Sequence, residues 1–567
     1  MVATLDFASD LTLILHSTFA VLFQRYKIEQ NTQTKKMKKT FIWGVLILSA
    51  GAFIAKVLGA IYRIPLTNII GAEGIGLYQM VFPLYSLLLV ASSAGIPTAI
   101  SRLVAEKTAQ NDNVGAKLVF KSALILMLLL SGIASIIIFF LSGTFARLQG
   151  NTSATMAYYV ISPAVIFSAV IASFRGYFQG RQNMVPTSIS MCIEQVVKVI
   201  FGLYFANLWL PMGIPYGVMG AVLGVTISEI VTSIIMAIQY FTYVKNEKVI
   251  FKKTKTAFHF SEYKLAIIKV FKVALPITLG SLILPLTLLI DSMLIINILS
   301  SSGFTTQIST SLYGLETGVV NSLINFPAVI SLSIATAIVP TLSSAITTGE
   351  NNSVSIKTKL AIKIAWLIAL PCFAGMLIFS DQIISVLYSG GLENTVIDEF
   401  LVAANLLKLS SISIIYIAFL QIFTATLQAY KKSYVPLVNL LIAVVLKVAL
   451  NLILIPIPLI NIQGAVIANI FCYFTACALN LLYLRKIIDL KINLKKFAII
   501  PIVSALIMSG ACLAIFKLLK PLVNMALALI IAVLIGALVY LVLIILLKVF
   551  ETEEKSYMPF LKRKVKV

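Results

Sequence analysis

The residues with the clearest chemical potential are charged side chains inside long apolar runs. Lys56 and Arg63 lie in the first run, Phe41 to Ile70, and are seven residues apart, about two turns of an α-helix, so they share one face. Two cations on one face form a strip that can bind a diphosphate, and the planar guanidinium of Arg63 suits bidentate contacts. The alternative for Arg63 is that its side chain extends to polar surroundings beside Pro65.

Later apolar runs carry further charges. Glu194 and Lys198 are four residues apart, in the order that favours an ion pair along a helix, and a role in a polar cavity is the alternative. Glu229 and Asp291 are single carboxylates that could pair with Lys56 or Lys198, or could bind a coupling cation such as Na+ or H+. A charge in an apolar run is costly, so it marks a partner or a water-filled cavity.

Four more charges complete this set of candidates. Lys447 stands close to the place in the second half of the chain that Lys198 holds in the first half, which favours a central position for it, and we expect both lysines to join Lys56 and Arg63 as cavity cations that bind substrate. Lys363, Lys408 and Glu316 lie nearer to the ends of apolar runs. We expect these three side chains to extend toward a polar interface.

The elements that must position these charges are membrane-spanning helices. Of the 567 residues, 60% are hydrophobic and 11% are charged, against about 25% charged residues in a soluble domain. Runs of about 20 apolar residues, enough to cross a bilayer, recur along the chain. They predict an all-α membrane protein with about fourteen spans, at residues 41–63, 76–101, 117–141, 155–177, 186–208, 217–243, 268–297, 312–340, 358–380, 401–428, 435–456, 463–485, 496–518 and 522–548.

The loops between these spans alternate in charge. One set is rich in Lys and Arg, and the other is nearly free of cations, with none in residues 207–216 and 456–462. Cation-rich loops are typical of the cytoplasmic side, so both termini are predicted to be cytoplasmic. The cations behind the net charge of +23 therefore lie in short loops, not on a basic face that could bind nucleic acid.

The two halves of the chain resemble each other. Val81-Phe82-Pro83 matches Asn325-Phe326-Pro327, and Gly220-Ala221 matches Gly464-Ala465. Such matches predict two six-helix lobes related by a parallel repeat, with two extra helices at the C-terminal end. The predicted regions are an extension (1–36), an N-lobe (37–244), a basic cytoplasmic linker (245–264), a C-lobe (265–490), the last two helices (491–550) and a basic tail (551–567). For the extension two interpretations stay open: native translation begins at Met37, or the extension is a short surface helix.

Several residue types exclude other functions or suggest movement. The dipeptide Gly-Lys of a phosphate-binding loop is absent, and the chain has only two histidines, so ATP hydrolysis and metalloprotease chemistry are not expected. The five cysteines lie in apolar runs without the spacing of metal ligands. Prolines inside spans, among them Pro65, Pro83, Pro97 and Pro327, predict bends that suit a gate.

Two stretches carry a family resemblance. The first runs Ser173-Phe174-Arg175-Gly176-Tyr177-Phe178-Gln179-Gly180 and continues through Val185-Pro186-Thr187 to Glu194-Gln195-Val196-Val197-Lys198. The second is Ser93-Ala94-Gly95-Ile96-Pro97-Thr98-Ala99-Ile100-Ser101. Over about residues 37–550 the chain resembles the stage V sporulation protein B group, which includes MurJ-type lipid II flippases and belongs to the multidrug/oligosaccharidyl-lipid/polysaccharide exporter superfamily.

The resemblance implies two lobes around a cationic cavity and a groove on the last two helices for a polyprenyl tail. It also implies transport of an undecaprenyl-diphosphate-linked oligosaccharide, above all lipid II, across a bacterial plasma membrane. Lys56 fits a cationic position of the family, and Arg63 fits another after a shift of one residue. Where Gram-negative MurJ proteins carry an Arg and a Glu in the eighth helix, this chain has Ser322 and Asn325.

The sequence therefore predicts a monomeric flippase that works by alternating access, without an ATPase motif or a bound cofactor. Its partners would be the lipid-linked diphosphate, the bilayer and cell-wall synthesis proteins. Other polysaccharide precursors, for teichoic acid, capsule or spore cortex, are alternative substrates. A cation-coupled multidrug exporter of the same superfamily and a non-transporting membrane scaffold are the alternative functions.

Overall fold

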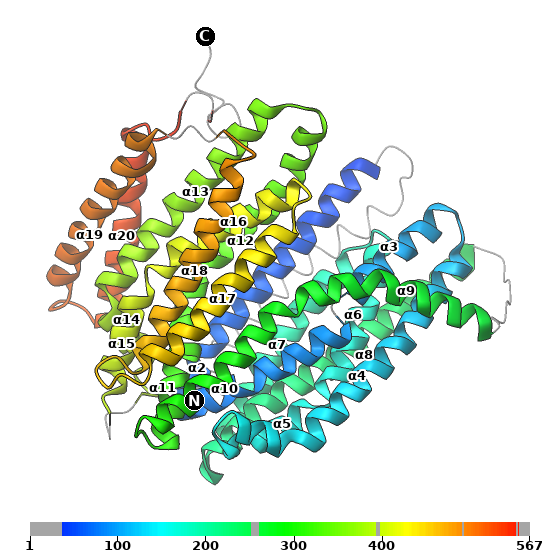
Figure 1. Cartoon of the computed structure of the whole chain (residues 1–567), viewed down its shortest axis with the longest axis horizontal. Helices are drawn as coiled ribbons and strands as arrows, with labels where there is room; N and C mark the ends of the chain where they lie inside the picture. Colours follow the sequence, from blue (N-terminus) through cyan, green and yellow to red (C-terminus); the bar gives the residue numbers. More distant parts are fainter. Residues whose placement is uncertain are drawn as a thin grey trace.

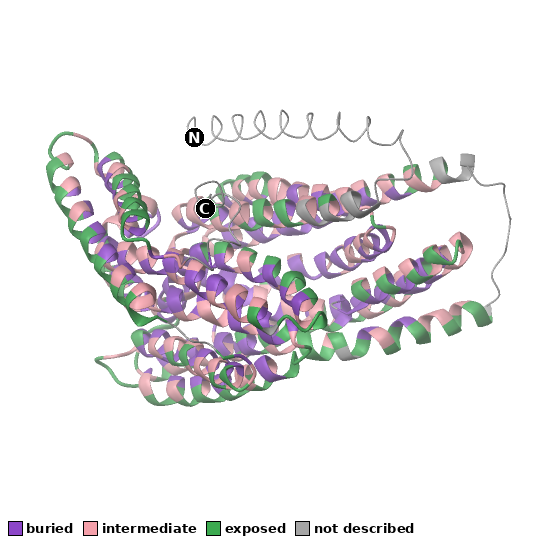
Figure 2. Ribbon diagram, turned by 90° about the horizontal axis from the view of Figure 1, so that it is seen from above, coloured by how far each residue is buried: buried purple, intermediate pink, exposed green. Residues whose placement is uncertain are grey.

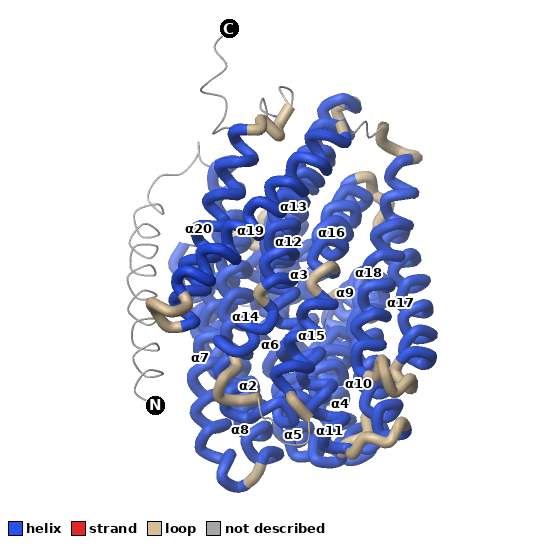
Figure 3. Tube along the Cα trace, turned by 90° about the vertical axis from the view of Figure 1, so that its left-hand side faces the viewer, coloured by secondary structure: helices blue, strands red, loops and turns tan. Residues whose placement is uncertain are grey.

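The computed structural model describes residues 37–93, 95–250, 260–392, 397–489, 493–551 and 554. The predictions for the extension 1–36, for residues 251–259 of the linker and for most of the tail 551–567 concern residues outside these ranges. Within them every regular element is a helix, as Figure 3 shows. This confirms the all-α prediction.

The number of membrane spans agrees with the expectation from sequence. The described residues hold 12 helical stretches long and apolar enough to cross a membrane, or 13 if the bent pair Glu399–Ser410 and Ser413–Ala429 is one span. One of them, Ile47–Ala109, has 63 residues and would be about 95 Å long if straight, roughly three times the hydrocarbon thickness of a bilayer. Counting its two crossings separately gives the fourteen expected spans.

The long helix α2 (Met37–Ser93) turns back on itself at Gly71. Gly71 has φ 73° and ψ −177°, a conformation open only to glycine at low cost. The rings of Tyr62 and Tyr78 lie 6.5 Å apart across this turn, whereas sixteen residues of straight helix would separate them by about 24 Å. Pro65 and Pro83 lie within helical parts of α2, so a glycine and not a proline makes its sharpest turn.

The first half of the chain packs around the two arms of α2 (Figure 1). It comprises α3 (Ile96–Ala109), α4 (Asn113–Leu148), η1 (Thr152–Ala154), α5 (Thr155–Ile161), α6 (Ala164–Gly180), α7 (Val185–Trp209), η2 (Leu210–Met212) and α8 (Ile214–Ile250). Helix α7 packs against α8 and α2, and α6 packs against α3, α4 and α8. This arrangement places α7 and its charges beside the first arm of α2.

The second half repeats this plan. It comprises α10 (Ile283–Ser301), α11 (Thr306–Gly314), η3 (Leu315–Val320), α12 (Asn321–Thr347), α13 (Asn351–Ile378), α14 (Ser380–Leu387), α15 (Glu399–Ser410), α16 (Ser413–Ala429), α17 (Tyr434–Leu454) and α18 (Ile462–Arg485). Helix α17 packs on α18 as α7 packs on α8. Helix α9 (Phe260–Ser281), which overlaps the expected seventh span, packs against α3 and α4 of the first half.

The last two long helices, α19 (Ile500–Leu519) and α20 (Met525–Leu546), form an antiparallel pair at one edge of the molecule, preceded by the π-helical turn η4 (Lys495–Ile499). They pack against each other and against α13 and α14. Figure 2 shows that much of their surface is exposed, and it carries large apolar side chains such as Leu506, Leu538 and Ile545. Such a surface suits contact with lipid.

Two glycines of the quoted motif allow α6 and α3 to approach closely. A Cβ atom at Gly176 would lie 2.8 Å from the carbonyl oxygen of Pro97, and one at Gly180 would lie 2.7 Å from that of Ser101. Glycines one turn apart are a common means of close helix contact in membranes. Pro97 and Pro186 are the second residues of α3 and α7, in the first helical turn, where proline needs no hydrogen-bond donor.

We expect Gly176→Val to destabilise the fold by about 1–3 kcal/mol or more, because the added side chain overlaps backbone atoms of α3. The measurement is the temperature at which the purified protein loses its monodisperse elution peak. Gly132→Ala is the matched control, since a Cβ atom there meets nothing within 4 Å. An unchanged transition temperature for Gly176→Val would contradict this account of the motif.

Candidate functional site

Three cations gather where α7 meets the first arm of α2, and we call Lys56, Arg63 and Lys198 the cation row. Lys56 is exposed, and Arg63 and Lys198 are partly exposed. Gly59 lies one turn from both Lys56 and Arg63, and a Cβ atom there would be 3.9 Å from Nζ of Lys198. Lys198 therefore reaches the stretch of α2 between the other two cations.

Lys198 has no carboxylate partner within ion-pair distance among the described residues. Its Nζ atom lies 5.7 Å from the centre of the Tyr62 ring, within the range of a cation–π contact. Arg63 donates from Nη1 to Oγ of Ser322 on α12, at 2.9 Å. The eighth span thus offers a hydroxyl group to Arg63, at the position where the sequence departs from Gram-negative MurJ proteins.

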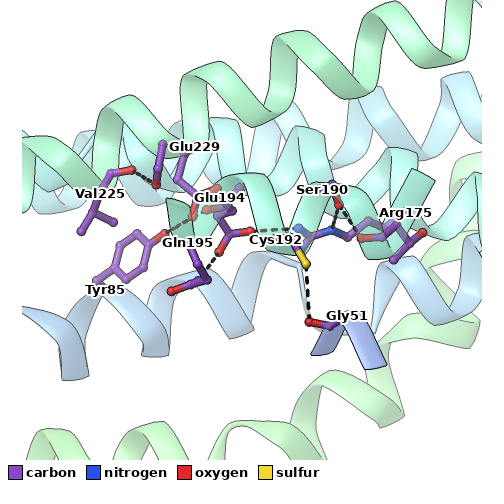
Figure 4. Close-up of polar contacts among 12 residues, drawn as sticks. Gly51, Tyr85, Arg175, Ser190, Cys192, Glu194, Gln195, Val225 and Glu229 are labelled. Carbon is purple, nitrogen blue, oxygen red and sulfur yellow. Dashed lines mark hydrogen bonds and ion pairs between the residues drawn. The ribbon is translucent and has the colours of Figure 1, made fainter. Parts of the chain in front are cut away.

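The ion pair expected between Glu194 and Lys198 is not formed. Glu194 instead accepts a hydrogen bond from Nη2 of Arg175 on α6 at 2.9 Å, and both side chains are about one-fifth exposed. Arg175 also donates from Nε to Ser190 Oγ at 2.9 Å, and Gln195 donates to Glu194 at 3.3 Å (Figure 4). The fork of Arg175 satisfies Glu194 across two helices and leaves Lys198 uncommitted.

Glu229 on α8 is buried at the other end of this cluster. The hydroxyl of Tyr85 donates to Glu229 at 3.4 Å (Figure 4). The same hydroxyl lies 2.8 Å from Oγ of Ser168. Glu229 does not pair with Lys56 or Lys198, although Lys198 and Arg175 are near enough to interact with it electrostatically. In the first half, the two carboxylates Glu194 and Glu229 therefore lie near at least two cations, Arg175 and Lys198.

Two of the candidate charges in the second half pair with each other. Lys447 on α17 forms an ion pair with Asp291 on α10, and the two side chains are 7% and 9% exposed. Asn451, one turn after Lys447, also donates to Asp291, at 3.5 Å. Lys447 is thus a committed cation, unlike its counterpart Lys198, and Asp291 does not reach either Lys56 or Lys198.

Two of the charges expected at polar interfaces are buried, and that expectation was wrong for both. Lys363 is 4% exposed, and its Nζ lies 2.6 Å from the carboxylate of Glu554, which follows the last helix. Glu316 is 2% exposed. Lys408 is exposed, as expected.

The two halves meet through hydrogen bonds at the end of the molecule that contains the Gly71 turn. Gln79 donates to the carbonyl of Thr317 at 2.8 Å, and Asn151 donates to Oγ1 of Thr310 at 2.9 Å. Asn68 donates to the carbonyl of Leu387 at 2.8 Å. Contacts of single hydrogen bonds, each of modest net energy, can be exchanged during a change of conformation.

The other residues singled out in the sequence lie in or near helices. Gln179 is partly exposed near the end of α6, and Pro327 lies inside α12. The five cysteines are free and buried or partly buried. Among the described residues no group of three or more His, Cys, Asp or Glu side chains could hold a metal ion.

Comparison with protein families gives two matches. The family described as "Polysaccharide biosynthesis protein" matches residues 41–346, and the MatE family matches residues 276–453. Together these matches cover both halves of the chain, which agrees with the repeat seen in the sequence.

Relatives from Bacillus subtilis align over most of the chain. Stage V sporulation protein B is 27% identical, and the alignment covers 82% of this chain and 87% of the relative. The lipid II flippase MurJ is 25% identical, with 79% and 83% covered. The uncharacterised membrane protein YabM is 29% identical, with 92% and 96% covered.

Solved structures share the fold. A lipid II flippase MurJ in an inward closed conformation has a TM-score of 0.64 at 17% identity, covering 88% of this chain and 98% of that one. An inward-facing multidrug resistance MATE transporter has a TM-score of 0.61 at 17% identity, covering 76% and 94%. The multi-pass fold of the multidrug/oligosaccharidyl-lipid/polysaccharide exporter superfamily predicted from the sequence is confirmed.

Proposed function

This chain belongs to the polysaccharide biosynthesis protein family, and from that premise we propose that it flips an undecaprenyl-diphosphate-linked oligosaccharide across a bacterial plasma membrane. The direction is from the inner to the outer leaflet, and the proposed substrate is lipid II, the peptidoglycan precursor. Relatives named stage V sporulation protein B and lipid II flippase MurJ support this class of function.

The observation that carries the proposal is the cation row. Lys56 is exposed although it lies well inside an apolar span, about 22 Å of helix from the Gly71 turn. A lysine ammonium that faces lipid at that depth is costly, which supports a water-filled space beside Lys56. Arg63 and Lys198 line the same stretch of α2, and the three cations are enough to neutralise the two negative charges of a diphosphate that links a lipid to a sugar.

The mechanism would be alternating access. The diphosphate-sugar head enters between the lobes and meets the cation row, while the polyprenyl tail stays in lipid along α19 and α20. The lobes then separate at the hydrogen-bonded end near Gly71, and the head leaves on that side. Pro65, Pro83 and Pro327, which lie inside helices, are the proposed sites of helix bending in this movement, whereas Pro97 stands at the start of α3.

The energy source would be the membrane potential, an ion gradient of Na+ or H+, or consumption of the product outside. Glu194, Glu229 and Asp291 remain candidate coupling or ion-pairing carboxylates, although Glu194 and Asp291 are already paired with Arg175 and Lys447. We propose a monomer with both termini in the cytoplasm, acting beside cell-wall synthesis proteins.

A cation-coupled multidrug exporter is the second candidate function. The MatE match at residues 276–453 and the similarity to a MATE transporter structure favour it. The cation row argues against it, because a cationic drug would be repelled by Lys56, Arg63 and Lys198. The extra pair α19 and α20 also suits a lipid-tailed substrate.

Depletion of the protein in its own host is the experiment that tests the substrate class. The proposal predicts that one undecaprenyl-diphosphate-linked intermediate accumulates on the cytoplasmic side, and its sugar separates lipid II from teichoic acid, capsule and cortex precursors. Drug sensitivity with normal levels of every lipid-linked intermediate would favour the exporter instead. Normal wall growth and no transport of any kind would favour a scaffold.

A further inference from the structure

The least expected buried charge is Glu316, which lies in the π-helical turn η3 between α11 and α12. Its side chain is almost fully buried, and its Oε1 atom accepts hydrogen bonds from Nδ2 of Asn321 at 3.0 Å and Nδ2 of Asn469 at 2.8 Å. Both partners are neutral amides. In the described part of the chain no cation lies within ion-pair distance of this carboxyl group.

The one cation that acts strongly on Glu316 is committed elsewhere. Lys447 and Asp291 both interact electrostatically with Glu316, but Lys447 is bound to Asp291. The local count is therefore two carboxyl groups and one ammonium. Asn451 donates from Nδ2 to Asp291, and its Oδ1 atom is buried without a hydrogen-bond donor. This cluster lacks one positive charge, or one proton.

The other titratable groups around η3 do not supply that charge. Tyr313 on α11 and Tyr473 and Cys472 on α18 are neutral at ordinary pH. Lys408 on α15 is exposed, and Arg63 on α2 donates to Ser322. A buried carboxylate left without compensation is costly, so the folded state favours the neutral acid.

We infer that Glu316 is a proton-binding site in the second lobe, distinct from the cation row. The carboxyl group binds one proton as the neutral acid and releases it to water when the site becomes hydrated, forming a carboxylate. A proton fits better than a metal cation, because only two carboxyl groups are present and Lys447 already occupies one of them.

The same turn links this proton to the contact between the lobes. A π-helical turn disturbs the regular ladder of backbone hydrogen bonds, and such turns are frequent at functional sites. The carbonyl of Thr317, next to Glu316, accepts a hydrogen bond from Gln79 of the first lobe at 2.8 Å. Ionisation of Glu316 would draw in water and donors, change this turn and weaken the bond to Gln79. A role of Glu316 in coupling rests on the proposed transport function. Proton binding by Glu316 does not depend on that function.

Infrared difference spectroscopy of the purified protein in nanodiscs, recorded during a pH titration, tests the proton. The wild type should show the C=O stretching band of a buried protonated carboxyl group, and Glu316→Gln should lack that band. The matched control is Asp381→Asn, which removes an exposed acid and should keep the band. A spectrum of Glu316→Gln identical to the wild type would overturn the inference.

Spin labels at the exposed positions Thr152 and Gln307, one in each lobe, test the link to lobe contact. The distance distribution should change with pH in the wild type and become insensitive to pH in Glu316→Gln, which mimics the neutral acid. A pH-dependent change retained in Glu316→Gln, or a wild-type distribution that responds to Na+ in place of choline at constant pH but not to pH, would overturn this link. Because neither readout involves a lipid substrate, failure of the flippase proposal would leave both results interpretable.

Discussion

Replacement of Asp291 with alanine is expected to destabilise the folded protein by about 3–5 kcal/mol, since it leaves the Lys447 ammonium buried without its partner. The two side chains are 9% and 7% exposed, so water cannot replace the lost carboxylate without entering the C-lobe. The measurement is the temperature at which half of the purified protein leaves the monodisperse elution peak. That temperature should fall by several degrees.

Two controls separate the buried pair from a general effect of mutation. Arg102→Ala removes an ion pair of 69% and 44% exposed side chains and should change stability by less than about 0.5 kcal/mol. The double variant Asp291→Leu/Lys447→Met replaces both charges with apolar groups and should recover much of the loss. A double variant no more stable than Asp291→Ala would show that this explanation is wrong.

The double variant Lys56→Ala/Arg63→Ala is expected to slow flipping of a lipid-linked diphosphate by about a hundredfold. Each charge-assisted hydrogen bond to a phosphate contributes about 1.5–3 kcal/mol, so loss of two such contacts accounts for a change of this size or more. Folding should be little affected, because Lys56 is exposed and Arg63 makes a hydrogen bond only to Ser322 through its side chain within the described residues. The measurement is the initial flipping rate at equal amounts of reconstituted protein.

Lys408→Ala is the matched control for this variant, because it removes an exposed lysine from the other lobe and should leave the rate unchanged. The conservative variant Arg63→Lys should lose part of the rate, since lysine keeps the charge but not the bidentate fork. Wild-type rates from Lys56→Ala/Arg63→Ala would remove these two residues from the binding site.

The spans and the grouping of Lys56 with Arg63 could be predicted from the sequence because both depend on local periodicity. Apolar runs of bilayer length identify helices whatever their neighbours are, and a spacing of seven fixes a shared helical face. The close contact of α6 with α3 at Gly176 and Gly180 was not predicted, although glycines one turn apart are a common sequence sign of such contacts.

The partners of the charges could not be predicted in the same way. Glu194 binds Arg175 and not Lys198, because a guanidinium on a neighbouring helix offers better hydrogen-bond geometry than a lysine on the same helix. The turn at Gly71 depends on a backbone conformation open only to glycine at low cost. Pro65 and Pro83, which we expected to bend the chain, lie inside helical parts of α2. From the sequence we placed Glu316 near a helix end. In the structure η3 continues into α12, and the side chain of Glu316 is buried in the core.

The most direct measurement of the central claim is flipping of a fluorescent lipid II analogue in liposomes that contain the wild-type protein. A membrane-impermeant reductant quenches only the fluorophores that reach the outer leaflet. We expect the analogue in the inner leaflet to become accessible to the reductant in a protein-dependent manner. We expect Lys56→Ala/Arg63→Ala to slow this step. Folded, reconstituted wild-type protein that moves the analogue no faster than protein-free liposomes, with undecaprenyl-diphosphate oligosaccharides of other sugars equally inert, would contradict it.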